Sequence, residues 1–152
     1  MTTTLTADRI EKITLLHAPQ SKVWKALTDA KQFATWFGIE LTEPFVVGRT
    51  VTGRMTMRGE QFTIEFAIER MDPEERFAYR WHPYAIDKKV DYSAEPMTLV
   101  EFRLKTVAEG TELTVVESGF DHIPAHRRDE AYRMNDGGWK SQIEKLRKYV
   151  SG

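Results

Sequence analysis

Apolar and polar residues alternate through the middle of this chain with the period of two that is typical of strands with one buried face. Between residues 45 and 119, five such runs follow one another, and compact turns at 58–61, 72–75 and 108–111 separate several of them. We therefore predict a mostly antiparallel sheet. Its inward-facing residues are Val51, Met55 and Met57; Phe62, Ile64, Phe66 and Ile68; Phe77, Tyr79 and Trp81; Val100, Phe102 and Leu104; and Leu113, Val115 and Glu117.

A further strand and two short helices are predicted before this region. Residues 8–17 alternate imperfectly, with Ile10, Ile13 and Leu15 as the apolar positions of the expected strand. From Pro19 onward, apolar residues recur at helical spacing, and a proline is well tolerated in a first helical turn. Asp29 and Gln32 resemble a capping box that starts a second helix, which Gly38 ends.

The last predicted element is a long amphipathic helix over residues 124–150, with Pro124 as its first residue. It contains the segment MNDGGWK, whose two adjacent glycines each cost about 1 kcal/mol relative to alanine in a helix. Gly138 flanks the apolar stripe, where it either lets the helix approach the sheet or leaves room for a guest. Gly137 points outward, and a kink is the one role we assign to it. The stripe consists of Tyr132, Asn135, Trp139, Ile143, Leu146 and Val150.

Composition narrows the function classes. A chain of 152 residues is most simply one domain, and its net charge of −1, with interleaved signs, gives no footprint for nucleic acid or an anionic membrane. The absence of cysteine removes disulfides, thiolate nucleophiles and sulfur metal ligands. The start MTTTLTADRIEK lacks the pattern of a signal peptide, and no apolar run approaches membrane-spanning length. We expect a single domain over residues 1–152 that is soluble and cytoplasmic.

Short motifs spread over nearly the whole chain point to a known family. They are Ala18-Pro19, Val23 to Asp29 (VWKALTD), Trp36-Phe37-Gly38, Tyr79-Arg80-Trp81, Gly110-Thr111 with Leu113-Thr114, Glu117-Ser118-Gly119-Phe120, and Asn135 with Gly138-Trp139. In this order the sequence resembles the START-like (SRPBCC) superfamily of birch pollen allergens and polyketide cyclases. Within it, the sequence is most similar to the branch related to activators of the ATPase of heat-shock protein 90. The resemblance implies an α+β helix-grip fold, in which a curved antiparallel sheet of about six to seven strands wraps around a long C-terminal helix.

The resemblance also implies a cavity between the sheet and the long helix that holds a hydrophobic small molecule. A solid core is the competing interpretation, because inward Phe, Met and Trp side chains are more often plain core. The polar segment 82–96, bounded by prolines, is the expected lid. The candidate ligand-binding residues are Trp36, Met55, Met57, Phe62, Phe66, Tyr79, Trp81, His82, Phe102, Asn135 and Trp139.

Two polar residues of this set have open alternatives, as does Glu117. Asn135 either orients a ligand or bonds to a loop backbone, since a buried amide without partners costs about 1–3 kcal/mol. Glu117 is either an acid inside the cavity or, as we favour, one partner of a salt bridge at its rim, with an arginine as the other. His82 overlooks the cavity mouth, where a hydrogen bond that anchors the loop is favoured over acid–base catalysis.

The other histidines do not suggest a metal site. His122 and His126 are four residues apart, but Pro124 between them marks the helix start and leaves His122 outside. His17 ends the first strand and is expected at the surface. No phosphate-binding glycine loop, nucleophile elbow or paired metalloprotease histidine motif is present. We therefore expect no metal and no cofactor.

The leading hypothesis is a protein that binds a hydrophobic, aromatic-containing small molecule without chemistry of its own. A second hypothesis is a co-chaperone that binds a heat-shock protein 90 type ATPase through its surface. The additional amino-terminal domain of the eukaryotic activators, which this sequence does not show, counts against it. A third hypothesis is a cyclase- or aromatase-like enzyme, which a buried titratable pair inside the cavity would favour. The fold alone does not choose among them.

Overall fold

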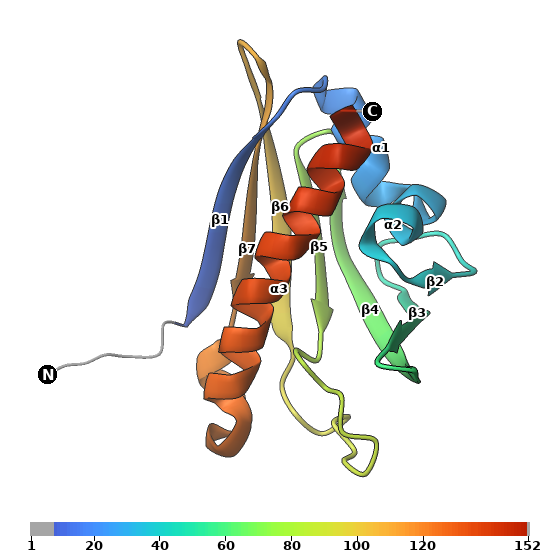
Figure 1. Cartoon of the computed structure of the whole chain (residues 1–152), viewed down its shortest axis with the longest axis vertical. Helices are drawn as coiled ribbons and strands as arrows, with labels where there is room; N and C mark the ends of the chain where they lie inside the picture. The colour runs from blue at the N-terminus through green and yellow to red at the C-terminus, as the bar shows by residue number, and fades with distance from the viewer. Residues whose placement is uncertain (1–7, 152) are drawn as a thin grey trace, which may run out of the picture.

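Seven antiparallel strands form one curved sheet, and a long helix, α3, lies across its inner face (Figure 1). The computed structural model describes residues 8–151. The strands follow the order β1-β7-β6-β5-β4-β3-β2 across the sheet, which confirms the predicted helix-grip fold. The strands are β1 (Arg9–Leu16), β2 (Glu40–Leu41), β3 (Thr50–Met57), β4 (Glu60–Asp72), β5 (Arg76–Trp81), β6 (Thr98–Val107) and β7 (Gly110–Ser118); the helices are α1 (Gln20–Thr28), α2 (Ala30–Phe37), the 3-10 turn η1 (Phe120–His122) and α3 (Ala125–Ser151).

The apolar positions predicted for the first strand, Ile10, Ile13 and Leu15, do not all face inward in the edge strand β1. Ile10 pairs with Glu117, and Leu16 pairs with Thr111, so these residues share the inward side of the sheet with their partners on β7. Ile10 and Leu16 are both buried, whereas Ile13 is 62% exposed. Ile13, one of the three apolar positions of the predicted strand, therefore faces outward, because pairing with β7 fixes which side of β1 faces the core.

The two short helices form where they were predicted. The side chain of Asp29 caps α2 by accepting a hydrogen bond from the backbone N–H of Lys31 at 3.0 Å. Gly38 ends the helix in the left-handed conformation, with φ of 82°, and its N–H bonds to the carbonyl of Ala34. The long helix begins at Ala125, directly after Pro124. These boundaries place the aromatic side chains Phe33 and Phe37 of α2 against one end of the β3–β4 pair.

Two features of the sheet had no signal in the hydrophobic pattern. The short strand β2 pairs with β3 at the sheet edge, and a register shift between Ile68 and Arg70 bends the long strand β4.

Two predictions concern residues outside the described part of the chain. The single domain was predicted over residues 1–152, and the lack of a signal peptide was predicted from the first residues; residues 1–7 and 152 lie outside the described residues. Among residues 8–151, no helix combines the length and the apolar character that crossing a membrane requires.

The two ends of the sheet are covered differently. At one end, α1 and α2 pack beside α3, and Phe33 of α2 lies 5.8 Å from the ring of Phe66 on β4. At the other end, the short 3-10 turn η1 adjoins α3, and the long loop 82–97 between β5 and β6 extends below the sheet (Figure 1). The second end is where the candidate site lies.

Candidate functional site

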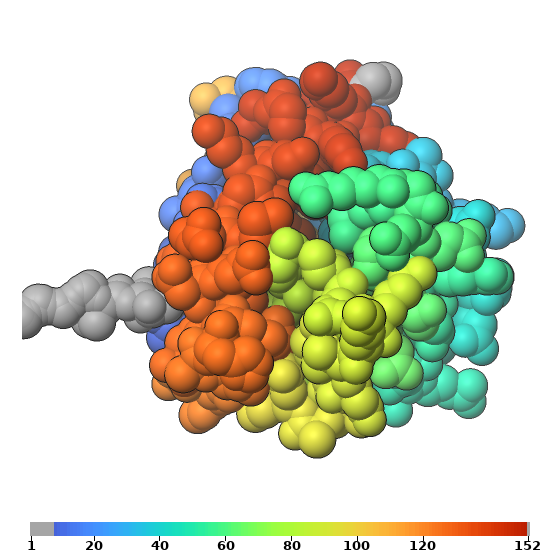
Figure 2. Space-filling view, turned by 60° about the horizontal axis from the view of Figure 1, so that its bottom comes forward, coloured from blue at the N-terminus to red at the C-terminus, as the bar shows by residue number. Residues whose placement is uncertain are grey.

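A cavity of about 540 Å³ lies between the β3–β4 pair, the β5–β6 loop and α3. Figure 2 shows its opening as a hollow between the long helix, the β5–β6 loop and the end of the β3–β4 hairpin. Apolar surface dominates the wall, as in most small-molecule sites. The wall is formed by Phe37 of α2; Met55, Met57, Phe62, Thr63, Ile64 and Glu65 of β3 and β4; Trp81 of β5; His82, Tyr84, Ala85, Ile86, Asp91, Tyr92 and Ser93 of the loop; and Met134, Asn135, Gly138, Trp139 and Gln142 of α3.

The structure brings together a large part of the predicted set in this wall. These residues come from three strands or their ends and from α3, and they are Met55, Met57, Phe62, Trp81, His82, Asn135 and Trp139. Their grouping gives the position of the predicted cavity, while their contact with a ligand remains a proposal.

Four predicted residues do not line the cavity, which corrects the expected lining. Phe66 and Tyr79 are fully buried with ring centroids 5.0 Å apart, and Phe102 lies 5.9 Å from Phe77 in a stacked pair. Trp36 donates its indole N–H to the carbonyl oxygen of Ala26 at 2.8 Å. All four positions face inward as predicted, but the aromatic residues around them fill the space, so the solid-core interpretation holds for this part of the molecule.

The carboxylate of Glu117 lies behind the cavity wall and is fully buried. The indole Nε1 of Trp81 donates to Oε2 at 2.7 Å, and that of Trp139 donates to Oε1 at 2.8 Å. Thr98 Oγ1 donates to Oε2 at 2.5 Å, and Asn135 Nδ2 lies 3.0 Å from Oε1 and 3.2 Å from Oε2. These four donors match the roughly four lone-pair positions of an ionised carboxylate. We call this group the Glu117 cluster.

The expected rim salt bridge of Glu117 is therefore wrong. Among the described residues, no cation forms an ion pair with it, because β7 places its side chain in the interior against the two indoles. Burial raises the pKa of Glu117 above its ordinary value, and the hydrogen bonds from Thr98, Trp81, Trp139 and Asn135 oppose that rise. Hydrogen bonds, rather than a cation, compensate the buried carboxylate.

Tyr79 is a second buried titratable group near the cluster. Its hydroxyl has no hydrogen-bond partner among the described residues. Burial and the nearby negative charge of Glu117 raise the pKa of Tyr79 well above its ordinary value. Neither Tyr79 nor Glu117 is part of the cavity wall, so this titratable pair lies beside the cavity rather than within it.

The segment MNDGGWK of α3 supplies one side of the cavity. Asn135 and Trp139 line the wall while their N–H groups turn toward Glu117, so the bond of Asn135 goes to a carboxylate and not to a loop backbone. A Cβ atom at Gly138 would meet no atom within 4 Å. Of its two predicted roles, leaving room for a guest fits this position and close approach to the sheet does not. Gly137 also meets nothing and lies on the outer face of the helix.

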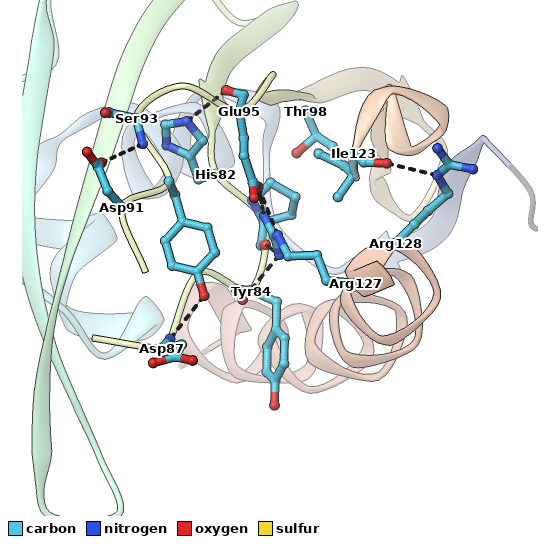
Figure 3. Close-up of polar contacts among 12 residues, drawn as sticks. His82, Tyr84, Asp87, Asp91, Ser93, Glu95, Thr98, Ile123, Arg127 and Arg128 are labelled. Atoms are coloured by element: carbon cyan, nitrogen blue, oxygen red, sulfur yellow. Dashed lines mark hydrogen bonds and ion pairs between the residues drawn. The ribbon is translucent and has the colours of Figure 1, made fainter. Parts of the chain in front are cut away.

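Arg127 of α3 fastens both ends of the β5–β6 loop (Figure 3). Its guanidinium forms an ion pair with Glu95 at 2.7 Å, donates to the carbonyl of Pro83 at 2.8 Å, and lies 4.7 Å from the ring centre of Tyr92. Both charged side chains are largely buried, at 11% and 14% exposure, so solvent screens this pair less than a surface one. His82 adds a bond from Nε2 to the carbonyl of Glu95 at 3.1 Å. The loop base is thus held against the helix.

No pattern in the sequence indicated the Arg127 contact, because its partners lie 32 and 44 residues away along the chain. For His82, by contrast, the structure shows both predicted features, the loop-anchoring hydrogen bond and a place in the cavity wall. His122 precedes α3 and His17 is exposed, as expected. Within residues 8–151, no group of three or more His, Asp or Glu side chains is arranged to hold a metal ion.

Solved structures with the same fold come from several bacteria. Protein MLL2253 from Mesorhizobium loti is 23% identical, with a TM-score of 0.73 over 94% of this chain and 96% of that one. The Aha1 dimer from Colwellia psychrerythraea is 17% identical, with a TM-score of 0.70 over 93% and 95% of the two chains. DynU16, from the dynemicin biosynthetic locus, is 25% identical with a TM-score of 0.70; the alignment covers 96% of this chain but only 48% of DynU16. These similarities establish the fold.

A search among curated proteins found no match to this sequence. A comparison with protein families found a match that extends over residues 17–151, from the end of β1 to the end of α3. It thus includes the cavity wall, the Glu117 cluster and the Arg127 contact. With this coverage, the chain belongs to the family described as Activator of Hsp90 ATPase homolog 1-like protein.

Proposed function

We propose that this protein binds a hydrophobic, aromatic-containing small molecule in the cavity between β3–β4, the β5–β6 loop and α3. In this proposal the protein holds its ligand and performs no chemistry on it. The helix-grip fold and the family are in general those of a ligand-binding domain. The observation that carries the proposal is the cavity itself, with its mostly apolar wall and its few fixed polar groups.

The shape of the wall favours a flat aromatic guest. The rings of Trp81 and Trp139 lie 5.8 Å apart, and their N–H groups are both occupied by Glu117. Both indoles are therefore fixed in orientation, so the part of each that borders the cavity meets a guest without the entropy cost of ordering the side chain. Met55, Met57 and Met134 add flexible apolar surface that adapts to the outline of a ligand.

The position of the buried acid favours binding over catalysis. An acid or base must come within hydrogen-bond reach of a reacting group. The oxygen atoms of Glu117 already accept from four donors, and Glu117 is not part of the cavity wall. The titratable pair that would favour a cyclase-like enzyme lies outside the space a substrate would enter.

Native mass spectrometry of freshly purified protein, followed by fluorescence titration with flavonoids, fatty acids and aromatic polyketides, tests the proposal. Saturable quenching should fall strongly in Trp139→Phe and persist in Trp24→Phe, a matched control on α1 outside the cavity wall. Asn135→Ala, as a separate variant, should also weaken binding relative to the wild type. A protein that carries no co-purified mass and responds to none of the ligands would contradict the proposal.

A second candidate is a surface contact with a heat-shock protein 90 type ATPase. The family description and three exposed apolar side chains favour it: Met57 at 37%, Met134 at 42% and Val90 at 44% exposure. Met57 and Met134 belong to the cavity wall, and Val90 lies in the β5–β6 loop. Stimulation of the purified ATPase that disappears in a Met57→Ser, Met134→Ser double variant would support this candidate, and unchanged ATPase turnover would remove it.

A further inference from the structure

We propose that the preferred ligand is an aromatic molecule with a hydroxyl group, and that this hydroxyl donates a hydrogen bond to Oδ1 of Asn135. The inference rests on the proposed small-molecule function and specifies its ligand class. It follows from how the Glu117 cluster distributes donors and acceptors along the α3 side of the cavity.

The first step concerns the donors in the wall. Trp81 and Trp139 each have one N–H, and both N–H groups point at Glu117, 2.7 and 2.8 Å from its oxygens. An indole has no other hydrogen-bonding group. These two residues therefore offer a ligand apolar ring surface but no donor. A ligand that must accept a hydrogen bond finds no partner on either indole.

The second step concerns the orientation of the Asn135 amide. A carboxylate with four donors around it accepts hydrogen bonds only, so the NH₂ group of Asn135 must face Glu117, 3.0 Å from Oε1. The amide is planar, and Oδ1 therefore points away from the carboxylate. Oδ1 has no hydrogen-bond partner among the described residues, and Asn135 is half-buried in the cavity wall. The cluster thus presents a fixed acceptor to the cavity.

The remaining polar groups of the wall give the ligand a direction. His82 bonds through Nε2 to the carbonyl oxygen of Glu95, so in the neutral ring Nε2 carries the proton and Nδ1 is an acceptor. Hydroxyl donors lie on the loop side, at Tyr84, Tyr92 and Ser93. A hydroxylated aromatic ligand that donates to Asn135 can therefore turn an acceptor of its own toward these hydroxyl groups of the loop.

The experiment compares ligands that differ only in this donor. Biphenyl-4-ol and 4-methoxybiphenyl form one pair, and 2-naphthol and 2-methoxynaphthalene form another. Affinities are measured by isothermal titration calorimetry, and occupancy of the cavity is followed through the indole N–H signals of Trp81 and Trp139 in ¹⁵N NMR spectra. Each methoxy compound is the more apolar of its pair, so burial of apolar surface alone would favour it.

We expect each phenol to bind about fivefold more tightly than its methyl ether, as the loss of one hydrogen bond predicts. In Asn135→Leu this preference should vanish or reverse while both compounds still bind. Gly137→Ala, on the outer face of α3 and outside the cavity wall, should retain it. A cooperative thermal unfolding transition and retained indole signals establish that Asn135→Leu is folded.

Two results would overturn the inference, and they differ in what they say about the proposed function. Equal or tighter binding of the ethers, with shifts of the indole signals, would remove the acceptor role of Asn135 and leave a small-molecule cavity. Absence of binding by all four compounds would count against the aromatic-binding function, and the inference would fall with it.

Discussion

The β3–β4 pair is packed differently along its length. At one end, α2 lies against the strands, and Phe33 and Phe37 contact Phe66 with ring centroids 5.8 and 6.4 Å apart. At the other end, Met55 and Phe62 face a cavity of about 540 Å³ that is bordered mainly by α3 and the β5–β6 loop, with Phe37 of α2 at its edge. Both ends carry the same kind of inward apolar residue. The difference shows that helix coverage, and not residue type, decides where this sheet is solid and where it is hollow.

The hollow end is also the polar end. A solid aromatic core holds itself together by apolar burial and ring contacts. Around the cavity, the buried Glu117 fixes two indoles and an amide, and Arg127 holds the loop base. Hydrogen bonds and an ion pair position the side chains that close packing would otherwise position. An open cavity can thus keep a defined wall.

The largest expected effect tests the two ends of β4 against each other. Phe66→Ala should lower the free energy of unfolding by about 3–5 kcal/mol, because a fully buried ring leaves a void. Phe62→Ala, four residues along on the cavity wall, should cost less than about 1.5 kcal/mol, because space already adjoins its ring. Urea unfolding measures both. Equal costs would mean that the cavity end is packed as tightly as the core.

A somewhat smaller effect is expected at the Glu117 cluster. Glu117→Leu should cost about 2–4 kcal/mol, because the donors of Trp81, Thr98, Trp139 and Asn135 lose their acceptor. Chemical denaturation measures the loss of unfolding free energy. The indole N–H groups of Trp81 and Trp139 should become mobile, as measured by NMR relaxation. A stability equal to that of the wild type would show that desolvation of the carboxylate cancels its hydrogen bonds.

The two glycines of α3 form a matched pair with a smaller effect. Gly137→Ala and Gly138→Ala should each raise stability by about 0.5–1 kcal/mol, because alanine favours the helix and neither new methyl group meets an atom within 4 Å. Ligand binding should weaken only in Gly138→Ala, because Gly138 is part of the cavity wall and the new methyl group would extend into the cavity. Thermal unfolding and ligand titration test the pair. Equal affinity in both variants would mean that no ligand reaches Gly138.

The smallest effect is a pH dependence from Glu117. Its pKa in the folded protein is raised above the ordinary value of 4.5, mainly by burial, so the folded state binds this proton more tightly than the unfolded state does. The stabilisation that comes from this tighter proton binding is therefore complete below pH 4.5. It is lost as pH rises through the pKa that Glu117 has in the folded protein. The stability difference between wild type and Glu117→Gln should shift against wild type over this window. A difference that does not change with pH would contradict the raised pKa.

Much of the fold was predictable because it depends on local periodicity. Alternation placed Phe66, Tyr79 and Phe102 on inward positions, and helical spacing placed Asn135 and Trp139 on the inner face of α3. The outcome at β1 was different, because an edge strand takes its facing from the partner strand, and Ile13 turned outward. Periodicity therefore identified faces reliably only where several inward residues alternate strictly.

The sequence by itself determined the order of the main elements, the family and seven of the twenty cavity-wall residues, since these follow from patterns within each segment. Tertiary structure alone decided which inward aromatic residues fill space and which border a cavity. It also decided that Glu117 meets donors 18, 19, 22 and 36 residues away instead of an arginine at the rim. The physical reason is that burial and hydrogen-bond partners depend on which segments meet across the fold, and periodicity within one segment carries no information about its neighbours in space.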